Sequence, residues 1–136
     1  MPHVVVEYSA NLEEKIDIRS LIGKVHDAVL ASGVFKAGAV RTRGERRDVY
    51  VIADGDPANA FVHVDLRVAP GRDTITRRRV AQGVFDTVVL ETRDVFARTG
   101  LALSVEVHEI DNDASLRLNN LHERLAANSV EKRAAQ

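Results

Sequence analysis

The chain has 136 residues, a formal net charge of −1 and no cysteine, and 45% of its residues are hydrophobic. This length predicts one domain with a substantial core, and the lack of cysteine excludes a disulfide framework or a thiolate site. The near-neutral charge gives no support for nucleic-acid binding, and no apolar run approaches the roughly 18 residues of a membrane helix. The N-terminus also lacks the regions of a signal peptide, so a cytoplasmic protein is expected.

The chain begins with a strand and a helix. Residues 3–8 form the short β-branched run typical of a buried central strand. Asp17 can cap a helix that runs to about Ser32, and Gly33 is a natural stop. One apolar stripe at helical spacing follows this helix: Ile18, Leu21, Ile22, Val25, Ala28 and Val29.

Two further short strands are predicted at residues 39–43 and 48–53, joined by a polar turn at residues 44–47. The Asp-Gly-Asp-Pro sequence at residues 54–57 marks a loop.

The second half repeats this order. Residues 61–68 alternate between apolar and polar side chains, which predicts a half-buried strand. The turn at Pro70 leads into a second long helix that is expected to end near Gly100, and residues 101–107 form another alternating strand. The expected core stripe of this helix is Ala81, Val84, Phe85, Val88, Val95 and Phe96.

The C-terminal part contains a short helix candidate near residues 116–127. The last residues, 128–136, are polar and basic. We therefore predict a single domain at residues 1–127, followed by a polar tail at residues 128–136.

Each half of the domain reads as strand, long helix, strand, and such a crossover makes its two strands parallel. Two of these units side by side predict an α+β fold, with a four-stranded mixed sheet and two helices on one face. The other face then lacks a cover, so a homo-oligomer that packs its sheets inward is expected.

Pro2 stands directly before the first strand and allows two interpretations. Proline is tolerated at the start of a strand, where it would have only a structural role. Alternatively, removal of Met1 makes Pro2 a free N-terminal secondary amine that can carry protons. If Met1 stays attached, the Pro2 nitrogen is an amide without basicity.

Three arginines could accompany such an amine. Arg41 and Arg43 share one side of a strand, where two like charges repel unless an anion lies near them. Arg72 lies in a turn before a helix, a position that favours anions. Solvated arginines are the alternative for all three. Nearby cations would lower the pKa of an amine base, and they would bind carboxylates and a developing enolate.

Other chemistry has little support in the sequence. The five histidines show no metal-binding spacing, so no metal site is predicted. Nucleotide-binding and nucleophile-elbow motifs are also missing.

Several segments resemble 5-carboxymethyl-2-hydroxymuconate isomerase, a family of the tautomerase superfamily. They are P-H-V-V-V-E-Y at the start, A-G-A-V-R-T-R, A-D-G-D-P-A-N-A-F-V-H-V, A-P-G-R and the N-N-L-H stretch at residues 119–122. The resemblance spans nearly the whole chain, in order.

This resemblance implies a homotrimeric β-α-β repeat fold, a mature chain that begins at Pro2, and cofactor-free ketonisation of a tricarboxylic dienol in homoprotocatechuate breakdown. Pro2 would take the 2-hydroxy proton and deliver it to C5. Arg41 and Arg72 would hold carboxylates and the developing oxyanion, and Arg43 would bind substrate.

Two alternatives remain open at this point. The same fold could act on another 2-hydroxydienoate, or as a decarboxylase or dehalogenase. It could also be a non-catalytic module that binds a small ligand, because fold does not dictate function.

Overall fold

The computed structural model describes residues 1–135. Its elements are β1 (His3–Ser9), η1 (Ala10–Glu14), α1 (Ile18–Ala31), η2 (Ala37–Ala39), β2 (Arg41–Arg47), β3 (Ala60–Val68), α2 (Thr74–Glu91), α3 (Arg93–Arg98), β4 (Leu101–Glu109) and α4 (Leu121–Ala134). No helix in this part of the chain has the length and apolar character that a membrane crossing requires.

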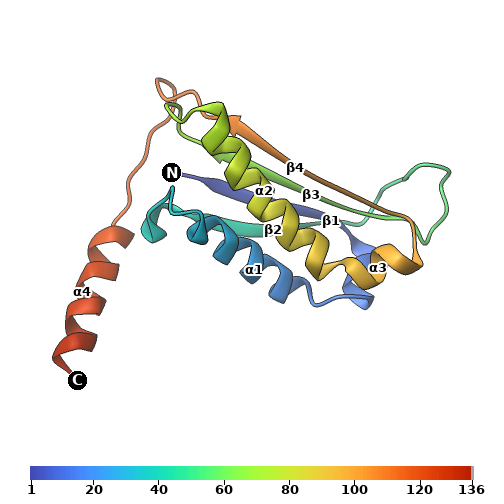
Figure 1. Cartoon of the computed structure of the whole chain (residues 1–136), viewed down its shortest axis with the longest axis horizontal. Helices are drawn as coiled ribbons and strands as arrows, with labels where there is room; N and C mark the ends of the chain where they lie inside the picture. Colours follow the sequence, from blue (N-terminus) through green and yellow to red (C-terminus); the bar gives the residue numbers. More distant parts are fainter. Residues whose placement is uncertain (136) are drawn as a thin grey trace.

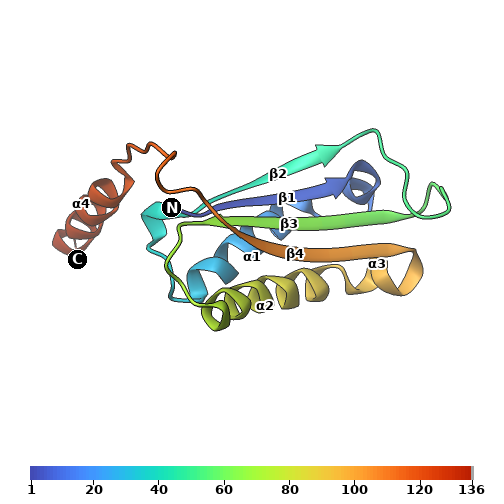
Figure 2. The same cartoon turned by 90° about the horizontal axis from the view of Figure 1, so that it is seen from above.

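The predicted fold class is confirmed. The four strands form one mixed sheet in the order β2-β1-β3-β4. Strands β1 and β2 are parallel, as are β3 and β4, whereas the central pair, β1 and β3, is antiparallel. Figures 1 and 2 show that α1 and α2 both cover the same face of the sheet.

The core lies between this face and the two long helices. Alternate residues of β1 and β3 are buried against the helices, among them Val4, Val6, Val64 and Leu66, each 0% exposed. Helix α1 contributes buried residues at helical spacing, and Asp17 accepts a hydrogen bond from the Ser20 N–H as predicted. The opposite sheet face carries charged side chains from every strand, among them Glu7, Arg43, Asp65 and Glu106.

One predicted strand is wrong. Residues 44–47, expected as a turn, continue β2, and residues 48–53 form a loop rather than a strand. The parallel pairing with β1 extends through Ser9, which lies opposite Arg47, so β2 continues as far as its partner does. Gly44 lies opposite Val6, and a larger residue would not fit there, since an added Cβ would lie 2.6 Å from Ile22 Cδ1.

The second long helix is interrupted. Thr92 separates α2 from α3, and its buried hydroxyl donates to the Val88 carbonyl at 2.7 Å. A side chain that bonds the carbonyl four residues back bends or ends a helix. Beyond this break Phe96 is 63% exposed, so its predicted place in the core is wrong, whereas Val84, Val88 and Val95 are buried as expected.

The C-terminal helix is longer than predicted and begins later. Helix α4 starts at Leu121 and continues to Ala134, through most of the segment predicted as a tail. None of its residues is buried, and Figure 1 shows it projecting from the end of the sheet where the N-terminus lies. The division into a domain at residues 1–127 and a tail stays a prediction.

Candidate active site

The N-terminus lies beside Arg41 at one end of the sheet. His3 is paired with Arg41 in the β1–β2 register, and the Arg41 N–H donates to the Pro2 carbonyl at 3.2 Å. Pro2 itself is buried. The parallel pairing of the first β-α-β unit therefore brings together two of the residues that the sequence singles out, although 39 positions of chain separate them.

Arg41 and Arg72 have guanidinium groups without an acidic partner among the described residues. Each donates only to a nearby backbone carbonyl, Arg41 to Ala39 and Arg72 to Ala69, both at 3.2 Å. The Arg72 guanidinium also lies over the Phe35 ring, 4.6 Å from its centroid, which fixes its direction. Both positive charges remain available to an anion.

The helix that follows Arg72 offers less to an anion than its position suggests. Asp73 caps α2 with its carboxylate, which accepts a hydrogen bond from the Thr76 N–H at 2.7 Å. The cap uses the Thr76 amide and places a carboxylate at the start of the helix, which disfavours an anion, so the cationic group that this turn offers is the Arg72 side chain.

Arg43 is held differently. Its side chain is exposed on the uncovered sheet face, where a guanidinium nitrogen lies 3.2 Å from His3 Nδ1. Burial and the charges of Arg43, Arg67 and Arg41 lower the pKa of His3 below its usual value, so the ring is neutral near pH 7 and Nδ1 can accept from Arg43. Arg43 therefore contacts a wall residue of the site rather than the site itself.

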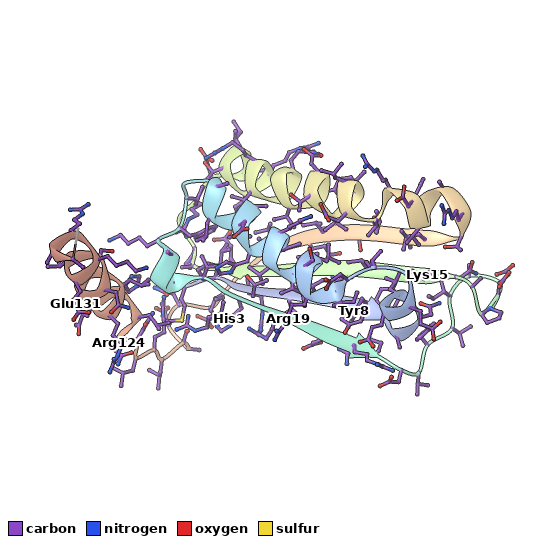
Figure 3. All side chains as sticks on the ribbon, turned by 90° about the horizontal axis from the view of Figure 1, so that it is seen from below. His3, Tyr8, Lys15, Arg19, Arg124 and Glu131 are labelled. Atoms are coloured by element: carbon purple, nitrogen blue, oxygen red, sulfur yellow. The ribbon has the colours of Figure 1, made fainter. Side chains whose placement is uncertain are left out.

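A cavity of about 240 Å³ opens at this end of the sheet. His3 and Arg41 line it together with Met1, and the segment after β4 supplies the rest of the wall: Ile110, Ser115, Leu116, Arg117 and Leu118. Figure 3 places His3 at this end, far along β1 from Tyr8.

The α-amino group of Met1 shows how strongly cations act here. Burial is the main cause of its lowered pKa, and the positive charges of Arg117, Arg72 and Arg41 lower the pKa further. Each of these effects disfavours the protonated amine. An amine at this end of β1 is therefore biased toward its free-base form.

Two residues of this site are missing from the sequence-based prediction. His3 carried no recognisable spacing with other histidines, although it directly follows Pro2. Arg117 lies in an irregular polar segment, where no periodicity assigns it a direction. Its one sequence signal is its place two residues before the N-N-L-H stretch.

Comparison with known proteins identifies the class first. The fold is that of the tautomerase superfamily, shared for example with N1, a member of the cis-3-chloroacrylic acid dehalogenase family. That structure gives a TM-score of 0.61 at 15% identity, covering 98% of each chain. At this identity the likeness concerns the fold alone.

The closer relatives are more specific. Residues 2–125 match the family of 5-carboxymethyl-2-hydroxymuconate isomerase, and the chain belongs to this family. The 5-carboxymethyl-2-hydroxymuconate Delta-isomerase of Escherichia coli is 31% identical over 122 residues, which cover 90% of this chain and 97% of that protein. A crystal structure of a 5-carboxymethyl-2-hydroxymuconate isomerase from Deinococcus radiodurans R1 is 32% identical with a TM-score of 0.85, covering 91% of this chain and 93% of the other.

Family membership decides between the broad alternatives. The chain is an isomerase of the tautomerase superfamily, and the resemblance found in the sequence is confirmed. The dehalogenase-like structures share the fold only, and a non-catalytic module is not supported.

Proposed function

We propose that this protein converts 5-carboxymethyl-2-hydroxymuconate to 5-carboxy-2-oxohept-3-enedioate, using the amine of Pro2 as general base after Met1 has been removed. The physiological setting we infer is homoprotocatechuate catabolism in the cytoplasm. No cofactor is needed for the conversion, because it moves one proton and two double bonds within a single molecule.

The observation that carries this proposal is the set of unpaired arginines around an N-terminal amine. Among residues 1–135 the Arg41 and Arg72 guanidiniums donate only to backbone carbonyls, and their charges lower the pKa of the Met1 amino group. Removal of Met1 would open the cavity onto Pro2 and leave its nitrogen one residue away, with consecutive Cα atoms about 3.8 Å apart. The same cations would then act on the Pro2 amine.

The reaction follows from these groups. The substrate carboxylates bind to the guanidiniums, which suit planar anions because they donate two parallel hydrogen bonds. The free Pro2 amine takes the proton of the 2-hydroxyl group, and negative charge develops on that oxygen and at C5. As the C2–O bond becomes a carbonyl, the C2–C3 double bond shifts to C3–C4. The electron pair of the former C4–C5 double bond forms the new C5–H bond with the proton that Pro2 returns. The arginines stabilise the intermediate charge.

Arg43 stays a predicted substrate-binding residue. Arg43 contacts His3, and His3 lines the cavity. Arg43 can therefore influence substrate binding by orienting the His3 ring.

The first test is the ultraviolet-monitored ketonisation of 5-carboxymethyl-2-hydroxymuconate by protein that intact mass shows to begin at Pro2. We expect a rate well above the buffer background and, in D2O, deuterium at C5 of the product by NMR. The matched substrate is 2-hydroxymuconate, which lacks the carboxymethyl group and should react with a lower kcat/KM. A processed protein that gives only the buffer rate would contradict the proposed substrate.

We also propose that the active form is a homotrimer. In the monomer the face of the sheet opposite α1 and α2 has no covering layer (Figure 2). This face is mixed in character: Val5 is apolar and only 8% exposed, and Glu7 and Arg47 form an ion pair at 2.8 Å. Light scattering at assay concentrations should give three times the mass of one chain, and the mass of a single chain under those conditions would contradict the trimer.

A further inference from the structure

The segment between β4 and α4 forms much of the wall of the proposed active site. It leaves β4 at the end of the sheet, passes beside the N-terminus and continues into α4, as Figures 1 and 2 both show. Five of the eight residues that line the cavity belong to it. The cavity is therefore closed by the C-terminal part of the chain as well as by β1 and β2.

Contacts with η2 fix this segment relative to Arg41. The Asn119 amide donates to the Gly38 carbonyl at 2.8 Å. His122, at the start of α4, lies so close to Gly38 that a Cβ there would be 2.8 Å from its Nδ1 and 3.0 Å from its backbone nitrogen. Because η2 ends two residues before Arg41, the same short stretch of chain positions both Arg41 and the segment.

Arg117 brings to the cavity a positive charge that no acidic group in the described part of the chain neutralises. Its guanidinium donates to the side-chain oxygen of Asn112, a neutral amide, and no carboxylate among residues 1–135 forms an ion pair with it. By contrast, Arg46 and Arg47 are each paired with two carboxylates. The positive charge of Arg117 also lowers the pKa of the Met1 amino group, whose residue lines the same cavity.

We propose that Arg117 forms a third carboxylate subsite, held in place by the Asn119 and His122 contacts with Gly38, that selects tricarboxylate over dicarboxylate substrates. This inference rests on the proposed function for the identity of the substrate. It adds a residue that family membership does not assign, in the C-terminal segment rather than in the β-α-β units.

The selectivity follows from counting charges on both sides. Arg41 and Arg117 line the cavity, Arg72 is the third guanidinium without an acidic partner in the described chain, and the proposed substrate carries three carboxylates. A dicarboxylate would leave one guanidinium without a partner, so it would form one charge-assisted pair less than the tricarboxylate.

The test compares Arg117→Gln with the wild type in Met-processed protein. We expect kcat/KM for 5-carboxymethyl-2-hydroxymuconate to fall about 10- to 100-fold, the effect of losing hydrogen bonds to a charged group, and kcat/KM for 2-hydroxymuconate to fall by less than about threefold. Arg124→Gln is the matched control, because Arg124 is exposed on α4 and apart from His3 (Figure 3). Both substrates are compared on the high-pH plateau, where the amine is deprotonated in either protein. An equal loss for both would mean that Arg117 acts on the amine or on the fold and would overturn the subsite.

Gly38→Ala tests the second half of the inference. The added methyl group would displace His122 and with it the segment, although Arg117 itself is unchanged. We expect the same selective loss for the tricarboxylate, with an unchanged unfolding temperature as the control for folding. Unaltered selectivity in this variant would contradict the role of the Gly38 contacts.

Calorimetric binding of two unreactive probes separates this inference from the proposed function. Wild-type protein should bind propane-1,2,3-tricarboxylate more tightly than glutarate, and Arg117→Gln should lose that preference. If the preference depends on Arg117 but no ketonisation occurs, the subsite stands and the proposed reaction fails. If ketonisation occurs and Arg117→Gln keeps the wild-type preference in both assays, the reaction stands and the subsite fails.

Discussion

A form of the enzyme that keeps one residue before Pro2 should lose about 10²- to 10⁴-fold in kcat/KM, the usual contribution of a general base. The extra residue turns the Pro2 nitrogen into an amide and moves the nearest amine one residue away from its place. Two cleavable N-terminal fusions provide the comparison, one leaving a single glycine before Pro2 and one releasing Pro2 itself. Ketonisation is followed in the ultraviolet for both, and intact mass confirms each N-terminus.

The pH profile identifies the amine independently. Burial and the charges of Arg117, Arg72 and Arg41 lower the pKa of the Met1 amino group, and we expect the same groups to lower the pKa of the Pro2 amine in the processed protein. As a base it is active when deprotonated, so kcat/KM should rise with pH through that pKa and level off above it. Because loss of a cation raises the pKa, the rising limb of Arg117→Gln should shift to higher pH. Similar rates for the glycine-extended and the processed forms would rule out Pro2 as the base.

Replacement of Arg72 or Arg41 by alanine should lower kcat/KM by about 10²- to 10³-fold, as expected when a group that stabilises a developing oxyanion is removed. Neither guanidinium has an acidic partner in the described chain, so its loss removes charge from the site without freeing a buried carboxylate. Lysine at either position should recover only part of the activity, because it cannot bind a carboxylate through two parallel hydrogen bonds. Steady-state kinetics of both series give these values.

Arg78→Ala is the matched control for this series. Arg78 is exposed near the start of α2. Its replacement should leave kcat/KM within about twofold, and Arg41→Ala or Arg72→Ala with the same small effect would contradict a role for that arginine in catalysis.

The architecture could be predicted because it depends on patterns that the sequence displays directly. The alternation in β3, the apolar stripe of α1 and its Asp17 cap are local. The β-α-β crossover then makes the two strands of each unit parallel, and its right-handedness places both helices on one face. The errors arise where pairing or a side chain overrides local preference. Residues 44–47 look like a turn, but they form a strand because β1 continues beside them. Thr92 ends α2 through a hydrogen bond to the Val88 carbonyl, which cannot be predicted from the residue composition of the segment.

The residues of the candidate site also fall into those that local patterns indicate and those that depend on long-range contacts. The strand pattern pointed to Arg41, which lines the cavity, and the turn before a helix pointed to Arg72; the roles of both stay predictions. Arg117 could not be found in this way, since its position depends on the Asn119 and His122 contacts with Gly38, more than 80 positions earlier in the chain. Such long-range contacts of irregular segments leave no periodic trace in a sequence.

The two β-α-β units of this chain have the same order of elements, but only the first begins at a chain terminus. Because β1 and β3 run antiparallel, the second unit begins at the opposite end of the sheet, at Ala60, the counterpart of the first unit's start beside His3. The chain reaches Ala60 from Asn59, so the nitrogen there is a peptide amide that donates to the Gly100 carbonyl. A terminus is something each polypeptide has only once. With Met1 removed as proposed, each chain has one proline amine for its two β-α-β units. A substrate mimic that reacts with this amine should therefore label one site per chain.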